Sequence, residues 1–177
     1  QVELGKESAV NAVKPHKKWL FINYVAADCN LTKLQLANLD QQENVGSDAN
    51  THIVAYVDVG PEPAPMKDAT PNLQTQATPE QPDPPNWSGA RTLYITKDNE
   101  PNKLNSEVIE EHGKNVDMSS PETLKKFVID AVKKFPAANV ALILNDHGGG
   151  HTGAMADDHD GDFMSMPGMR KALSEAQ

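Results

Sequence analysis

Hydrophobic residues along the chain gather in a few continuous runs that polar stretches separate. Three of the runs are short, rich in Val, Leu and Ile, and bounded by polar residues or glycine. They cover residues 19–27, 52–59 and 140–146. Such runs are typical of strands buried on both faces of a sheet. We therefore predict three buried strands, the last of which leads directly into His147 and three glycines.

A helix is predicted between the first two strands, over residues 31–44. Its leucines recur at roughly helical spacing, Asn30 is placed to cap its start, and Gly46 can end it. Since the helix joins two buried strands, we expect those strands to be parallel neighbours connected by a right-handed crossover.

A second helix is predicted over residues 121–135, where apolar residues follow the i, i+3, i+4, i+7 pattern of one helical face. A serine N-cap is expected from Ser119 and Ser120, Pro121 falls in the first turn, and Glu122 lies near the positive end of the helix dipole. Pro136 ends the pattern. This helix leads to the third buried strand and completes a second crossover.

The remaining segments give weaker signals. Residues 1–18 have no periodicity and are expected to form an N-terminal arm, with one domain over residues 19–177. Eight of the 13 prolines fall in residues 60–88, a composition that cannot build a core and predicts a surface insertion. Residues 91–96 alternate enough for a half-exposed strand, whereas residues 98–118 are polar with turn signals.

Composition narrows the classes of function. A chain of 177 residues suits one domain or part of a larger one, and its net charge of −9 argues against nucleic-acid binding. The sequence contains no run of about 18 apolar residues, so no transmembrane helix is predicted. Cys29 is the only cysteine, which excludes an internal disulfide and any site with several cysteine ligands.

The position of His147 indicates chemistry. In open α/β sheets, ligands bind at the carboxyl ends of the strands, and His147 comes directly after such an end. The three glycines that follow allow the backbone to approach a substrate closely and leave N–H groups available for an anion. A strand followed by an ordinary flexible turn, with a histidine held by local hydrogen bonds, is the alternative interpretation.

Several motifs, taken in order, resemble those of the clostripain family of cysteine peptidases. They are Tyr24–Asp28 with Asn30 and Leu31, Trp87–Arg91, Pro121–Leu124, Ala141–Gly150, and Gly161–Asp162 before a short helix. The resemblance runs from about Trp19 to Leu173. It implies an α/β fold, a caspase-like three-layer sandwich with a mostly parallel central sheet that is incomplete in this chain. It also implies a bacterial endopeptidase that is secreted, cell-surface or periplasmic.

The resemblance also implies roles for individual residues. His147 matches the catalytic histidine, and the backbone N–H of Gly148 matches a donor of the oxyanion hole. The family's nucleophile is a cysteine at the end of the next parallel strand, after the helix that begins here near Ser165. The chain ends before that strand. We therefore expect a light-chain-like portion, inactive alone, whose partner is a C-terminal, heavy-chain-like polypeptide that carries the cysteine. The implied substrate is a peptide or protein, cut after Arg or Lys in many family members.

Two nearby side chains are weaker candidates. Cys29 also follows a strand end, so a dyad of Cys29 and His147 is conceivable, but the family has its nucleophile elsewhere and we expect Cys29 to be a bystander. Asp146 would point to the face opposite His147 if the strand continued through it, so it is not expected to act as a triad acid.

Four carboxylates in six residues form a candidate calcium site: Asp157, Asp158, Asp160 and Asp162. Hard oxygen ligands with a glycine turn suit Ca²⁺, and calcium dependence is known in the family that the chain resembles. No glutamate closes the loop as in an EF-hand, and a solvated acidic loop is the alternative. No cofactor is expected for the chemistry itself.

Two rival functions fit part of the pattern. The first is a metal-dependent hydrolase that uses His147, His151, Asp157 and His159, although glycines between the first two histidines argue against a shared helix face. The second is a caspase-like binding module without catalytic activity. Metal analysis tests the first, and a cysteine at the next strand end would exclude the second.

Overall fold

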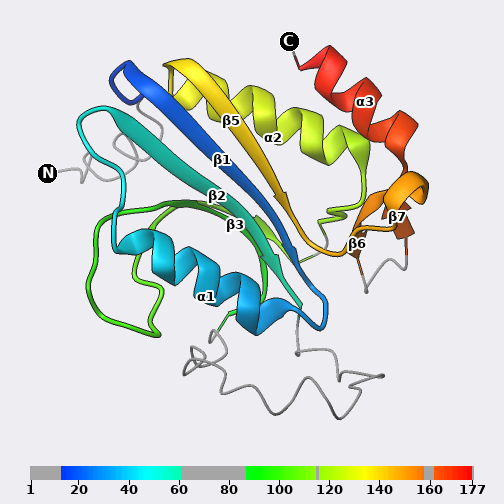
Figure 1. Ribbon diagram of the computed structural model, residues 1–177, viewed down its shortest axis with the longest axis horizontal. Coiled ribbons are helices and arrows are strands. Elements are labelled where there is room, and N and C mark those ends of the chain that lie inside the picture. Colours follow the sequence, from blue (N-terminus) through cyan, green and yellow to red (C-terminus); the bar gives the residue numbers. More distant parts are fainter. Residues whose placement is uncertain (1–12, 61–86, 115, 158–161, 177) are drawn as a thin grey trace, which may run out of the picture.

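The computed structural model describes residues 13–60, 87–114, 116–157 and 162–176, and these contain a five-stranded sheet (Figure 1). The strands are β1 (Lys17–Ala27), β2 (Thr51–Val59), β3 (Gly89–Tyr94), β4 (Glu107–Gly113) and β5 (Ala137–Asn145). Their order in the sheet is β4-β3-β2-β1-β5. Strand β1 is parallel to both β2 and β5, while β3 and β4 extend the sheet in antiparallel fashion. The predicted strands and both parallel pairings are confirmed.

Helices cover both faces of the sheet and complete three layers (Figure 1). Helix α1 (Thr32–Glu43) lies on one face, and α2 (Pro121–Lys134) and α3 (Met166–Glu175) lie on the other. Alternate side chains of β1 divide between two hydrophobic clusters: Ile22 and Tyr24 pack on the α2 side, and Val25 and Ala27 on the α1 side. The predicted α/β three-layer sandwich is therefore confirmed, with its central strands parallel.

The start of α1 differs from the prediction. Its N-cap is Leu31, with no side-chain capping bond, so the assignment of Asn30 as N-cap was wrong. Asn30 instead turns toward the end of β5. The predicted stop is confirmed, because Gly46 has a φ of 65° and its N–H donates to the carbonyl of Gln42. Helix α2 begins as predicted, at Pro121 after the N-cap Ser120.

The antiparallel part of the sheet was only partly predicted. Strand β3 was expected to be half-exposed, but it lies between β2 and β4 and is mostly buried. Strand β4 was not predicted, because glutamates interrupt its apolar pattern and, among its apolar side chains, Ile109 is buried. Its pairing with β3 is also broken by two register shifts. Charged residues and register irregularities are typical of an edge strand that does not accept a further neighbour.

Strand β5 was predicted as a buried strand of a sheet that is incomplete in this chain; it is only partly buried, and it lies at the open edge of that sheet. Within the described residues it pairs only with β1 and forms the other edge of the sheet. Leu142 and Leu144 pack toward the α2 cluster, but Val140 is 45% exposed and Ile143 is 43% exposed. An aliphatic strand of nine residues thus lies at an open edge, with apolar side chains in contact with solvent.

A small hairpin follows β5 where the sequence suggested a loop. After a 3-10 turn at Gly150–Thr152, β6 (Ala154–Asp157) pairs with β7 (Asp162–Met164). Met155 and Met164 are both 1% exposed and fix the hairpin to the α2 side of the core. Helix α3 comes next, at the predicted place, and Ser165 caps it by accepting a bond from the Gly168 N–H.

The predicted arm and insertion fall mostly outside the described residues, which exclude 1–12 and 61–86. The described end of the arm bonds to the body, since the N–H of Lys14 donates to the carbonyl of Lys134. Among the helices in the described ranges, none combines the length and apolar character that crossing a bilayer requires.

Candidate active site

His147 lies just past the carboxyl end of β5, as the sequence predicted. Strand β5 ends at Asn145, and the imidazole of His147 is exposed at this edge of the sheet. Its Nε2 atom lies 2.6 Å from Oδ1 of Asn30, which is in the turn between β1 and α1. Because β1 and β5 are parallel, their carboxyl ends meet here and two turns far apart in sequence come into contact.

Cys29 occupies the turn beside Asn30 but faces inward. The thiol is 1% exposed, and its Sγ lies 3.5 Å from the carbonyl oxygen of Ala26 and 3.4 Å from Oδ1 of Asp146. The N–H of Leu31 also points at the sulfur, at 3.4 Å. Enclosure of this kind holds a thiol firmly but blocks the approach of a bulky substrate.

Gln35 fastens the two strand ends together. Its side chain is buried under the first turns of α1, and Nε2 donates to the carbonyls of Ala26 and Asn145, each at 3.1 Å. The Gln35 amide thus connects the carboxyl-terminal ends of β1 and β5. Thr32 adds a second tie, because its hydroxyl donates to the carbonyls of Ala27 and Cys29 at 2.6 Å. The site residues are therefore supported by rigid elements.

Asp146 joins the same cluster, because the strand continuation that would have turned it away from His147 does not occur. The strand ends one residue earlier, so the alternation of side chains that places neighbours on opposite faces no longer applies. One ligand-type atom from each of Cys29, Asp146 and His147 lies within 4.8 Å of the others. Both Asp146 and Asn30 are contacts that sequence reasoning missed, and their only signal was their position directly after a strand.

The glycine segment after His147 is shaped by backbone hydrogen bonds. The N–H of Gly149 donates to the carbonyl of Gly153 at 2.8 Å, and that of Met155 donates to the carbonyl of His147 at 3.2 Å. Gly148 is exposed, and a Cβ atom added to it would meet nothing within 4 Å. Gly148 itself pairs with Ala154 in an isolated antiparallel bridge, so this segment has a defined backbone geometry.

The acidic cluster is described only in part. Asp157 and Asp162 are paired in register across the β6–β7 hairpin, while Asp158 and Asp160 lie outside the described residues. His159, a ligand in the rival metal-hydrolase interpretation, lies outside them as well. The metal-capable group that the described residues do contain joins His147 to Cys29 and Asp146, not to His151.

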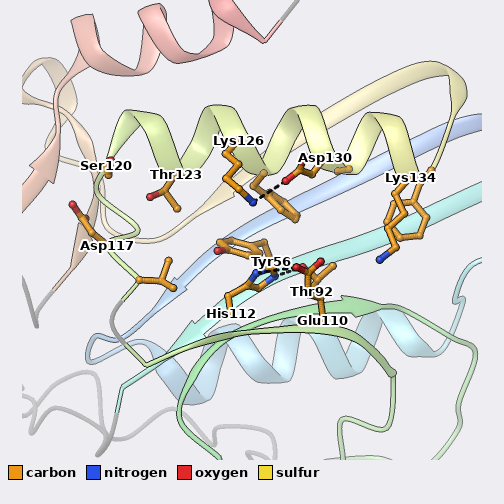
Figure 2. A pocket seen from close by; sticks show the side chains of 14 residues that line it. Tyr56, Thr92, Glu110, His112, Asp117, Ser120, Thr123, Lys126, Asp130 and Lys134 are labelled. Atoms are coloured by element: carbon orange, nitrogen blue, oxygen red, sulfur yellow. Dashed lines mark hydrogen bonds and ion pairs between the residues drawn. The ribbon is translucent and has the colours of Figure 1, made fainter. Parts of the chain in front are cut away.

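A separate cavity of about 480 Å³ lies between α2 and strands β2–β4 (Figure 2). Two pairs of its polar groups are bonded to each other: Lys126 bonds Asp130 at 2.9 Å, and His112 bonds the Thr92 hydroxyl at 2.7 Å. Burial lowers the pKa of His112 and raises the pKa of Tyr56 to about 12, so both side chains stay neutral near pH 7. None of Cys29, Asp146 and His147 lines this cavity.

Solved structures of bacterial cysteine proteases share this fold. One is a secreted C11 cysteine protease from Bacteroides thetaiotaomicron, in complex with an irreversible peptide inhibitor. It is 17% identical with a TM-score of 0.64, and the match covers 91% of this chain and 40% of the protease chain. An inactive zymogen C11 protease from Parabacteroides distasonis is 18% identical with a TM-score of 0.57, and the match covers 92% of this chain and 40% of the zymogen chain. A B. fragilis cysteine protease is 17% identical with a TM-score of 0.51, and the match covers 75% of this chain and 91% of that protease chain. This chain thus shares its fold with solved C11 cysteine proteases.

The sequence model of the clostripain family matches residues 23–177. This chain therefore belongs to the clostripain family of cysteine peptidases, as the motifs had suggested. It spans 40% of the length of two of the similar structures. Among curated proteins, none matches the sequence.

Proposed function

We propose that this chain supplies the catalytic histidine and part of the oxyanion hole of a cysteine endopeptidase. The observation that carries the proposal is the exposed position of His147 at the carboxyl end of β5, directly beside the open edge of the sheet. The imidazole protonates the leaving amine when a thiol attacks the peptide carbonyl. The backbone N–H of Gly148 donates to the oxyanion that forms in the transition state.

The nucleophile belongs to further polypeptide that adds a strand beside β5. Parallel strands lie about 4.8 Å apart, so the first residues past the end of such a strand arrive next to His147. Helix α3 supports this placement, because it packs against α2 on one face of the sheet, where a crossover to a new parallel strand has to run. The partner is a C-terminal, heavy-chain-like polypeptide, and the substrate is a peptide or protein.

Cys29 is a poor candidate for the nucleophile. Its sulfur is 1% exposed and is enclosed by Asp146, the Ala26 carbonyl and Oε1 of Gln35. A scissile carbonyl must come within about 3–3.5 Å of the attacking atom, and this enclosure prevents it. We assign secretion to the intact protein as well, on the support of the similar protease described as secreted.

Replacement of His147 tests the proposal in the protein that contains this chain together with its remaining polypeptide. His147→Ala should lower kcat/KM for a peptide substrate by about 10²–10⁴-fold, the share that general acid–base catalysis contributes. His151→Ala is the matched control, since it removes an exposed imidazole four residues away and should keep full activity.

Labelling with a thiol-reactive peptide inhibitor locates the nucleophile. Cys29→Ala should still be labelled, because the reactive thiol is a different one. Full activity in His147→Ala would contradict the assignment of the histidine. Loss of labelling in Cys29→Ala would instead make Cys29 the nucleophile, and a protein with no peptidase activity at all would favour a binding module.

A further inference from the structure

Three side chains at the joined ends of β1 and β5 have the chemistry of a transition-metal site. They offer a thiol from Cys29, a carboxylate from Asp146 and an imidazole from His147, with one atom of each within 4.8 Å of the others. Thiolate, carboxylate and imidazole are the ligands that Zn²⁺ takes in proteins. We propose that these three residues bind a zinc ion.

The distance between two of the three ligand atoms already fits zinc, and the imidazole has to close a gap of at most 4.8 Å to each of them. Zinc–ligand bonds of about 2.0–2.3 Å place tetrahedral ligand atoms roughly 3.3–3.8 Å apart. The Sγ of Cys29 already lies 3.4 Å from Oδ1 of Asp146, within that range. A cation that enters takes the place of the thiol proton, which makes the sulfur a thiolate ligand.

The surroundings hold the three ligands in place before a metal arrives. Gln35 ties the carbonyls of Ala26 and Asn145 together, so the two turns that carry the ligands keep a fixed separation. The amide of Asn30 contacts Nε2 of His147 and fixes the orientation of the ring. Partners of this kind are what orient the ligands of known zinc sites.

The ligand set separates this group from an ordinary acidic patch on the surface. Its sulfur is the only thiol of the chain and is 1% exposed. A soft thiolate with a borderline imidazole favours zinc over calcium or magnesium, which prefer oxygen ligands. Three protein ligands also leave a fourth position for water, as in zinc sites that exchange a ligand.

Bound zinc would restrain the peptidase. An imidazole that ligates a metal cannot exchange protons with a substrate, so the occupied protein should be inactive until the metal leaves. This consequence rests on the catalytic role proposed for His147, whereas the binding of zinc does not. The metal site would therefore let the zinc concentration set the fraction of active enzyme.

Zinc titration against a chromophoric chelator tests the site in the full protein, freed of metal beforehand. We expect one zinc ion per chain. Cys29→Ser and the nearly isosteric Asp146→Asn should each weaken binding by about tenfold or more, by loss of one ligand. His151→Ala is the control and should bind as the wild type. Equal affinity in Cys29→Ser and the wild type, or no binding by the wild type, would overturn the proposal.

Cobalt identifies the ligand atom directly. Co²⁺ bound by the wild-type protein should show a thiolate-to-cobalt charge-transfer absorption that Cys29→Ser lacks. If the absorption survives in Cys29→Ser, the sulfur comes from another cysteine and the proposal is wrong. Peptide hydrolysis measured in the same zinc titration separates the two proposals: zinc bound through Cys29 without inhibition would support the metal site and contradict the catalytic role of His147.

Discussion

His147 and Asn30 lie on turns 117 residues apart, yet the ring Nε2 and the amide Oδ1 are separated by 2.6 Å. An amide oxygen can only accept a hydrogen bond, so the Nε2 atom carries a proton in this contact. Asn30 therefore positions the imidazole through its ring nitrogen.

Asn30→Ala should lower kcat on the order of 10- to 100-fold with little change in KM, because a loosened imidazole is misplaced during proton transfer. Asn30→Asp should recover part of the activity, because a carboxylate can still accept the bond from the ring N–H. Steady-state kinetics provide the measurement. An unchanged kcat in Asn30→Ala would show that the contact has no part in catalysis.

Calcium, if the protein requires it, should act through residues 157–162. Four carboxylates within six residues of the sequence repel one another unless a cation lies among them. Asp158→Asn combined with Asp160→Asn should raise the calcium concentration needed for half-maximal activity. Asp117→Asn, which changes a carboxylate away from the hairpin, serves as the control. An unchanged calcium titration in the double variant would move the site elsewhere.

Residues 1–177 expressed alone should associate through β5, because an aliphatic edge strand is a template for pairing. Val140→Lys should weaken this association on the order of tenfold by placing a charge on the edge. Val132→Lys adds the same charge to an exposed position on α2 and should not. Analytical ultracentrifugation measures the effect. A monomeric, sharply melting and active fragment would refute the two-part active site.

His52 should make the protein less stable in mild acid. Its ring is fully buried, with the Tyr94 hydroxyl 2.9 Å from one nitrogen and the Pro15 carbonyl 2.8 Å from the other. Burial lowers the pKa of His52 below its ordinary value, although the bond to Pro15 opposes the shift. The unfolded chain then binds more protons than the folded one below about pH 6.5, so stability falls as the pH falls.

The loss should not exceed about 1.4 kcal/mol per pH unit for each such histidine. His112, whose pKa is lowered by burial as well, contributes in the same direction. Urea unfolding of the intact protein at pH 7.5 and 5.5 measures the loss, which should shrink in His52→Gln and persist in His151→Gln. Equal losses in His52→Gln and the wild type would show that other groups cause the acid sensitivity.

The sequence predicted those parts of the fold where apolar pattern alone decides the structure. The runs around Tyr24 and Tyr56 became central strands, and the face of α2 that carries Phe127 packs on them. Strand β4 escaped prediction because an edge strand buries few side chains, and only Ile109 marks its inner face clearly. The open edge at β5 agrees with the incomplete sheet that the family resemblance implied, although the apolar pattern alone does not show how many neighbours a strand has.

The candidate site was predicted in its position but not in its contacts. The glycines after His147 marked the end of a strand, and the family resemblance supplied the catalytic role. The closeness of Cys29 and Asp146 could not be predicted, because it depends on β1 and β5 ending at the same level of the sheet. A shift of one residue in the end of β5 also decides which way Asp146 points.

The contrast between the two edges of the sheet limits how copies of this chain can meet. The edge at β4 carries three glutamates, and its pairing with β3 is irregular; the glutamates are Glu107, Glu110 and Glu111. The edge at β5 is apolar. Contact is therefore favourable only between two β5 strands, which lie antiparallel across a twofold axis. Such a contact is closed, because each copy uses the one apolar sheet edge found among the described strands and turns its acidic edge outward. Unpartnered chains should accordingly end as dimers, and the β4 edge prevents growth into a fibre.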